Sequence, residues 1–185
     1  MSPLLANDSG RSHSMSAVIT TDRLTLRRIW LEDAPTITDL VNQPQIYRMV
    51  VSIPAHQTVA QTEDWIAKHP SGRETNTKHI LAIEQDKRLI GVVSGERKDT
   101  HLPFNVGYWL APSAWGNGFM TEAAGALLQW LRDRGERAFV SGYLADNPAS
   151  GRVLEKLRFM KADRRKVFCM GRGERVDHFD MARVG

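Results

Sequence analysis

The segment Gly107–Ala124, GYWLAPSAWGNGFMTEAA, constrains the fold of this chain more than any other. It reads as an apolar strand, a turn punctuated by Pro112 and two glycines, and a helix that starts with small residues. Glycines at 116 and 118 let backbone N–H groups gather around an anion, and the helix that follows adds the positive end of its dipole. The pattern therefore predicts a strand–turn–helix unit that binds a diphosphate group.

Spacing excludes the two commonest phosphate-binding turns. A P-loop needs Gly-Lys-Ser/Thr, but this chain has Gly118-Phe119-Met120. A dinucleotide fingerprint needs a third glycine where Thr121 stands, and an acidic residue about 20 positions further on, where the chain reads Phe139-Val140-Ser141. Neither a P-loop nor a Rossmann site is predicted.

Composition fits one soluble α/β domain. The chain has 185 residues, of which 42% are hydrophobic and 25% charged, and no apolar run approaches the roughly 20 residues of a membrane span. The net charge of +4 comes from scattered basic residues, so nucleic-acid binding is not favoured. Cys169 is the only cysteine, which excludes an intrachain disulfide and indicates a reducing cytoplasm. The histidines lack metal-ligand spacing, so no metal is predicted.

The first 17 residues mix Ser, Asn, Asp, Gly and His with little periodicity, and we expect a flexible tail there. Met15 offers an alternative start, which leaves open whether residues 1–14 are native. Residues 18–185 are predicted to form a single domain.

Periodicity outlines the elements of that domain. We expect strands at 23–27, 80–83, 89–93, 106–111 and 138–145, and a last hairpin joining 167–170 to 178–184. Apolar residues at helical spacing predict helices from 31 to 41, 59 to 68 and 120 to 131. Asn147-Pro148 reads as a helix cap followed by proline at the first helical position. Residues 71–78 are polar and turn-rich.

Five motifs occur in one order: TDRLTLRR at 21–28, GVV at 91–93, GYWL at 107–110, WGNGFMTEA at 115–123 and NPAS at 147–150. Together they resemble the GNAT acetyltransferases, in the branch that acetylates ribosomal-protein N-termini and many small amines. The resemblance covers residues 20–184. It implies an α/β (α+β) fold with a mixed, bent sheet of six or seven strands and about four helices. That sheet is splayed between the strands 107–111 and 138–145.

The resemblance implies that acetyl-CoA, used as a cosubstrate, fills the splay. The pantetheine arm would pair with the main chain of Trp109, Leu110 and Ala111. The pyrophosphate would bind the loop that comprises Trp115, Gly116, Asn117, Gly118, Phe119, Met120 and Thr121. Asn147 is expected both to cap a helix and to contact the pantetheine arm. Arg152 is expected to contact the CoA phosphates. Ser113 departs from the family, which often has Arg or Gln there.

Catalytic assignments are harder because two familiar residues are missing. Relatives often use a glutamate base where this chain has Asn105, so Glu96 is the first substitute and Glu84 the second, although a solvated charge explains Glu96 equally well. Relatives place a tyrosine acid where this chain has Leu154, which leaves Ser150, Tyr143 or a water. The resemblance assigns the thioester oxyanion to a backbone N–H in the segment 109–111, and we take this to be the amide of Leu110.

The sequence therefore predicts an acetyl-CoA-dependent N-acetyltransferase that works by direct attack in a ternary complex. Its acceptor is a primary amine, either a protein N-terminus or a small molecule, held by residues 42–57 and the turn 169–178. The alternative is a catalytically weak acyl-CoA-binding or regulatory module of the same fold. No membrane partner is expected, and a homodimer is left open.

Overall fold

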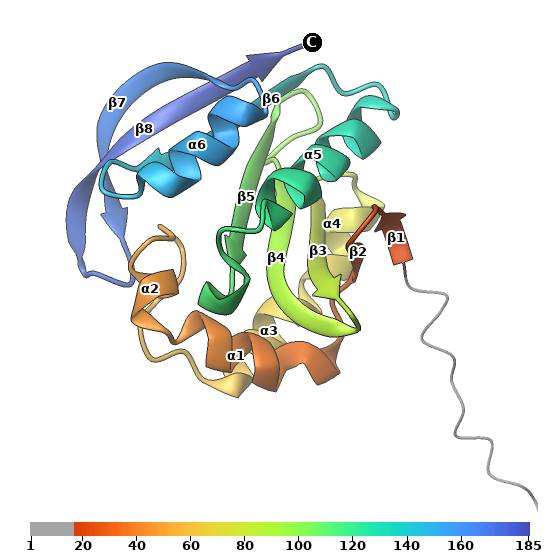
Figure 1. Cartoon of the computed structure of the whole chain (residues 1–185), viewed down its shortest axis with the longest axis vertical. Coiled ribbons are helices and arrows are strands. Elements are labelled where there is room, and N and C mark those ends of the chain that lie inside the picture. The colour runs from red at the N-terminus through yellow and green to blue at the C-terminus, as the bar shows by residue number, and fades with distance from the viewer. Residues whose placement is uncertain (1–16) are drawn as a thin grey trace, which may run out of the picture.

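The computed structural model describes residues 17–185 (Figure 1). Its strands are β1 (Ala17–Thr20), β2 (Thr25–Arg28), β3 (Lys78–Gln85), β4 (Arg88–Glu96), β5 (Phe104–Leu110), β6 (Ala138–Leu144), β7 (Met160–Cys169) and β8 (Glu174–Val184). Its α-helices are α1 (Ala34–Val41), α2 (Pro44–Tyr47), α3 (Val59–Ala67), α4 (His69–Glu74), α5 (Phe119–Arg132) and α6 (Pro148–Lys156). Short 3-10 turns precede α1 and α5, at Leu31–Asp33 and Pro112–Ala114. The tail predicted for residues 1–17 lies almost wholly outside the described part.

The strands form one mixed sheet in the order β1-β2-β3-β4-β5-β6-β8-β7 (Figure 1). Helices α5 and α6 cover one face, where Leu127, Leu128 and Leu154 are fully buried in the main core. Helices α1 and α3 cover the other face around Ile37 and Val92. The predicted α/β class and mixed sheet are confirmed, with eight strands between residues 17 and 185 in place of six or seven.

The sheet divides between β5 and β6, its only parallel neighbours within the described residues. Pairing there is limited to Phe104 with Phe139 and Asn105 with Val140. The buried hydroxyl of Ser141 donates to the Val106 carbonyl oxygen at 2.7 Å, which ties the two strands at the point where they separate. Beyond Ser141 the two strands diverge, so the main-chain groups on that side of β5 face an opening and have no strand to pair with. This is the splay predicted from the resemblance.

Several local predictions are confirmed. Helix α5 buries Met120, Ala123, Ala124, Leu127, Leu128 and Leu131 at steps of three and four. The Asn147 side chain caps α6 by accepting from the Ser150 N–H at 3.3 Å. The residues at 71–78 differ from expectation, because α4 occupies 69–74 where a polar loop was predicted. There Pro70 fits the first turn of a helix, and burial of His69 and Gly72 outweighs the polar composition.

The family-like N-terminal motif holds a buried ion network. Arg27 donates to both carboxylate oxygens of Asp33 at 2.7 and 2.8 Å, and to Glu84 on β3 at 2.7 Å. Its side chain is 10% exposed. Burial alone lowers the pKa of the guanidinium, but the two carboxylates outweigh burial and raise it. Arg27 therefore stays charged and joins β2, β3 and the start of α1.

No helix within residues 17–185 is long and apolar enough to cross a bilayer.

Candidate functional site

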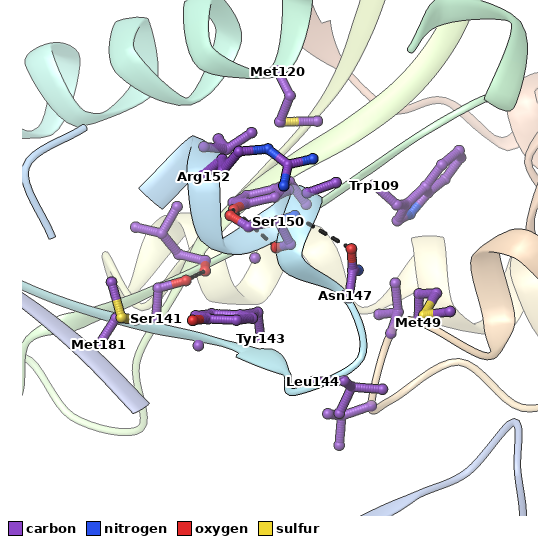
Figure 2. Close-up of a pocket in the computed structure, with 18 of the residues that line it drawn as sticks. Met49, Trp109, Met120, Ser141, Tyr143, Leu144, Asn147, Ser150, Arg152 and Met181 are labelled. Carbon is purple, nitrogen blue, oxygen red and sulfur yellow. Dashed lines mark hydrogen bonds between the residues drawn. The ribbon is translucent and has the colours of Figure 1, made fainter. Parts of the chain in front are cut away.

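One cavity of about 1190 Å³ occupies the splay (Figure 2). Its walls come from β5, β6, the glycine loop and the first turns of α5 and α6. It continues past β6 to the segment 45–52 and to the C-terminal hairpin. The cavity thus has one half next to the helix N-termini and a second half between α2 and β8. We call these the α5 half and the β8 half.

The glycine loop presents backbone amides to the α5 half. Gly116 and Gly118 have φ values of +79° and +77°, a left-handed conformation that other residues rarely adopt. Gly118 is the N-cap of α5, and no side chain caps this helix. The N–H groups of Phe119, Met120 and Thr121 are therefore left for an external acceptor, because the first turn of a helix has no carbonyl behind it. Free backbone amides at the positive end of a helix are suited to an anion.

Arg23 fixes the shape of that loop, and sequence reasoning gave it no role. Its guanidinium lies 2.6 Å from Glu122 in the first turn of α5 and donates to the Asn117 carbonyl oxygen at 3.0 Å. It also stacks over the Phe119 ring at 4.6 Å. Burial raises the pKa of Glu122, but hydrogen bonds from Thr21 and Arg23 and the charge of Arg23 together outweigh burial and lower the pKa. The negative charge of Glu122 is thereby turned toward Arg23 and balanced.

Main-chain direction along β5 decides which amides reach the splay. The Ala111 N–H donates to the Ile90 carbonyl oxygen on β4 at 2.8 Å, and Ala111 does not line the cavity. Successive residues of a strand point their main-chain groups to opposite sides, so the amides of Leu110 and Tyr108 face β6. The assignment of Leu110 as a donor toward the splay fits this geometry. The pairing assigned to Trp109 and Ala111 is corrected, because the Ala111 amide is bonded to β4 and the Trp109 amide, two residues away, faces the same side.

Most of the other predicted binding residues line the cavity, and one of them supports the loop from outside it. The cavity is lined by Trp109, Leu110, Trp115, Gly116, Gly118, Phe119, Met120, Thr121, Asn147 and Arg152. Asn117 does not line it; its side-chain amide donates to the carbonyl oxygens of Ala114 and Trp115 and so braces the turn. The Trp115 indole donates to the Leu110 carbonyl oxygen at 2.9 Å, which anchors the loop to the end of β5.

Ser150 lies at the meeting point of α6 and β5 (Figure 2). The Tyr108 hydroxyl donates to the Ser150 carbonyl oxygen at 3.0 Å and accepts from the Ser150 hydroxyl at 3.1 Å. Burial raises the pKa of Tyr108 to about 12, and the bond to Ser150 lowers it only in part. Tyr108 is therefore a neutral phenol that positions Ser150. The two residues are 42 positions apart in sequence, so no local pattern could have paired them.

The carboxylates offered as bases lie away from the cavity. Glu96 does not line it and sits 3.6 Å from the Lys78 ammonium on the neighbouring strand. Glu84 is bonded to Arg27 in the buried network described above. Asn105 does line the cavity, but an amide cannot accept a proton from an amine. The structure thus does not bring Glu96 together with Leu110 and Ser150.

The tip of the C-terminal hairpin is bonded to the segment that lines the β8 half. The Met170 N–H donates to the Val51 carbonyl oxygen at 3.0 Å. The guanidinium of Arg172 donates to the Arg48 carbonyl oxygen at 2.6 Å and to Asp146 at 2.7 and 3.0 Å. These contacts join the segment 48–51 to the hairpin and form the wall where an acceptor was expected. Across residues 17–185, no group of three potential metal ligands gathers in the structure.

Comparison with known proteins agrees with this geometry. Residues 23–160 match the family model described as an acetyltransferase (GNAT) domain. The chain is 25% identical over 152 residues to the N-acetyltransferase YoaA of Bacillus subtilis (strain 168), covering 80% of this chain and 85% of that protein. It is 36% identical over 76 residues to the ribosomal-protein-serine acetyltransferase of Escherichia coli (strain K12), covering 40% and 42% respectively.

Among solved structures, the fold is similar to that of RimL, the ribosomal L7/L12 alpha-N-protein acetyltransferase, in its complex with coenzyme A. The TM-score is 0.81 at 22% identity, over 91% of this chain and 97% of that one. Because the family model spans most of the chain, including the splay and the glycine loop, this protein belongs to the GNAT acetyltransferase family.

Proposed function

We propose that the protein transfers an acetyl group from acetyl-CoA to a primary amine by direct attack within one cavity. The observation that carries this is the continuous cavity joining the uncapped N-terminus of α5 to the unpaired edge of β5. Amides of residues 119–121 suit a pyrophosphate, and the extended edge of β5 suits the pantetheine arm. The RimL structure named above contains coenzyme A, which supports the same choice of ligand.

Different residues of the α5 half are proposed to act on different parts of acetyl-CoA. The Leu110 N–H faces the splay, so it is placed to stabilise the oxyanion that develops when a thioester is attacked. The Ser150 hydroxyl, held by Tyr108, is the group we assign to the leaving thiolate. Arg152 lines the same half and supplies positive charge toward phosphates. Holding both reactants in one cavity lowers the entropic barrier without a covalent enzyme intermediate.

We place the acceptor amine in the β8 half of the cavity. Apolar side chains of Met49, Val51 and Val167 line it together with charges of both signs. We propose a protein N-terminus or a small amine as the acceptor. The name of the E. coli relative, a ribosomal-protein-serine acetyltransferase, supports testing N-terminal serine first. A cytoplasmic location, which the single cysteine favours, and the homodimer left open above belong to this proposal as well.

The test is calorimetry with acetyl-CoA followed by an acetylation assay. The amine panel holds heptapeptides that begin with serine or alanine, a heptapeptide whose only amine is a lysine side chain, and tyramine. We expect 1:1 binding of acetyl-CoA and release of CoA with at least one amine. Binding without turnover on the whole panel would favour the acyl-CoA-binding module instead. Failure to bind acetyl-CoA would reject both.

Ser150→Ala is expected to lower kcat about 10- to 100-fold, a loss typical of removing one proton-transfer group or of weakening its position. Tyr108→Phe should lower kcat less, about three- to tenfold, because it removes the two hydrogen bonds between the phenol and Ser150, each worth about 1 kcal/mol, but keeps the serine hydroxyl itself. Neither change should alter the Kd of acetyl-CoA by more than about threefold. Steady-state kinetics at saturating acetyl-CoA measures the first effect and calorimetry the second. An unchanged kcat in Ser150→Ala would show that water protonates the thiolate.

A further inference from the structure

A histidine lines the β8 half of the cavity, where the acceptor amine is proposed to bind. Among the histidines of residues 17–185, only His178 lines the cavity. It is 8% exposed and lies on β8, opposite Leu144 of β6. The cavity that reaches the Leu110 amide is the same one that reaches this imidazole.

Gly142 makes room for the imidazole. A Cβ atom at Gly142 would lie 2.6 Å from the Nε2 atom of His178 and also 2.6 Å from the Phe179 carbonyl oxygen. The ring therefore occupies the space that a side chain on β6 would take. A glycine in the middle of a strand often marks such a close approach. Packing against the backbone of β6 fixes where the ring edge points.

Asp180 lies beside the other nitrogen. The Nδ1 atom of His178 is 3.0 Å from Asp180 Oδ1, and Nδ1 is fully buried without a partner in hydrogen-bond geometry. The second carboxylate oxygen accepts from Arg165 on β7 at 2.6 Å. Asp180 is thus tied to β7 and offers its negative charge to the imidazole. A carboxylate beside one ring nitrogen stabilises the imidazolium that forms when the other nitrogen takes a proton.

The surroundings keep the ring neutral at pH 7. Burial lowers the pKa of His178 below its usual 6.5, Arg165 lowers it further, and Asp180 raises it in part. The β6 residues against the ring, Gly142 and Leu144, carry no charge. A neutral imidazole can accept a proton at once, whereas an imidazolium cannot.

We propose that His178 is the general base that removes the proton from the attacking amine, with Asp180 as its positioning residue. This inference rests on the proposed function. In the step, the amine nitrogen forms a bond to the acetyl carbon and the carbon–sulfur bond breaks, with its electron pair leaving on sulfur. The proton lost by nitrogen goes to His178, and the thiolate takes the proton of the Ser150 hydroxyl, which leaves an imidazolium and a serine alkoxide. Return of the proton from the imidazolium through water restores both groups.

The test measures kcat of the full-length protein between pH 5 and 9, with saturating acetyl-CoA and the fastest amine of the panel above. The wild type should lose activity as the pH falls through a pKa below 6.5, because protonated His178 cannot act as a base. This fall in activity is the acidic limb of the pH profile. His178→Gln should lower kcat at pH 7 about 100-fold or more and remove the acidic limb. Its Kd for acetyl-CoA should stay within threefold. Imidazole added to His178→Ala should restore part of kcat.

His79→Gln is the matched control. His79 is half-buried and burial also lowers its pKa, but it packs on Trp130 and contacts Asn76, outside the cavity. This variant should keep the wild-type kcat and the acidic limb.

Asp180→Asn keeps the proposal testable if both His178 variants misfold. Loss of the carboxylate removes the charge that favours imidazolium while Arg165 remains, so the acidic limb should move to lower pH. A limb that stays in place would overturn the proposal, and so would a wild-type kcat in His178→Gln. If the wild type itself binds no acetyl-CoA, the proposed function fails before this question arises. If it binds and acetylates but ignores the His178 change, only this inference fails.

Discussion

Gly118→Val is expected to weaken acetyl-CoA binding by about 30- to 100-fold. Gly118 has φ of +77° at the N-cap of α5, and a left-handed conformation costs an L-residue about 1–2 kcal/mol, more when it is β-branched. Relaxing the strain would turn the amides of residues 119–121 away from the cavity. Each charge-assisted bond lost there is worth about 1.5–3 kcal/mol. Together these terms exceed the 1.4 kcal/mol that changes affinity tenfold.

The matched control is Gly135→Val, beyond the other end of the same helix. Gly135 has φ of +95°, has nothing within 4 Å of an added Cβ, and does not line the cavity. The two substitutions should cost similar stability in urea denaturation, and only Gly118→Val should change the Kd measured by calorimetry. Equal affinities for the two variants would mean that the glycine loop does not hold the pyrophosphate.

Arg27→Ala is expected to lower the free energy of unfolding by about 3–5 kcal/mol, which is the usual cost of removing one partner from a buried ion network. The arginine is bonded to Asp33 and Glu84, whose side chains are 13% and 20% exposed. Its removal leaves two carboxylates facing each other with little water. It also leaves a cavity where the aliphatic stem packed. Urea denaturation followed by circular dichroism measures the change through the midpoint at constant slope.

Arg164→Ala provides the comparison for this prediction. Arg164 pairs with Asp177 at 3.0 Å, but the two side chains are 61% and 40% exposed. An exposed pair contributes about 0–1 kcal/mol because water screens it. If Arg27→Ala costs no more than Arg164→Ala, the buried network does not stabilise β2 against β3.

The sequence predicted the strand, the turn and the helix that form the α5 half of the cavity, because these elements are local. The strand, the glycine turn and the first turn of α5 follow one another within residues 107–121, so spacing alone shows where the amides and the positive end of the helix lie. The Asn147 cap of α6 is likewise a contact over three residues. Such features depend on backbone geometry, and Gly and Asn are the residues that adopt or cap it, so their positions in the sequence predict it.

The hydrogen bonds of β5 show what local sequence patterns cannot predict. Trp109, Leu110 and Ala111 are consecutive, and the sequence gives no sign of which amides face β4 and which face the splay. Only the register of β5 against β4 settles it, and Ala111 proves to be bonded to Ile90. A shift by one residue would reverse the assignment.

By itself, then, the sequence determined the fold family, the glycine loop before α5 and the capped start of α6, because each depends on residues close together along the chain. Only the tertiary structure placed Arg23 against Glu122, Tyr108 against Ser150, and His178 over Gly142. These pairs are separated by 99, 42 and 36 positions respectively. Side chains so far apart meet only when strand order and register are set by burial over the whole sheet, and no local pattern encodes that outcome.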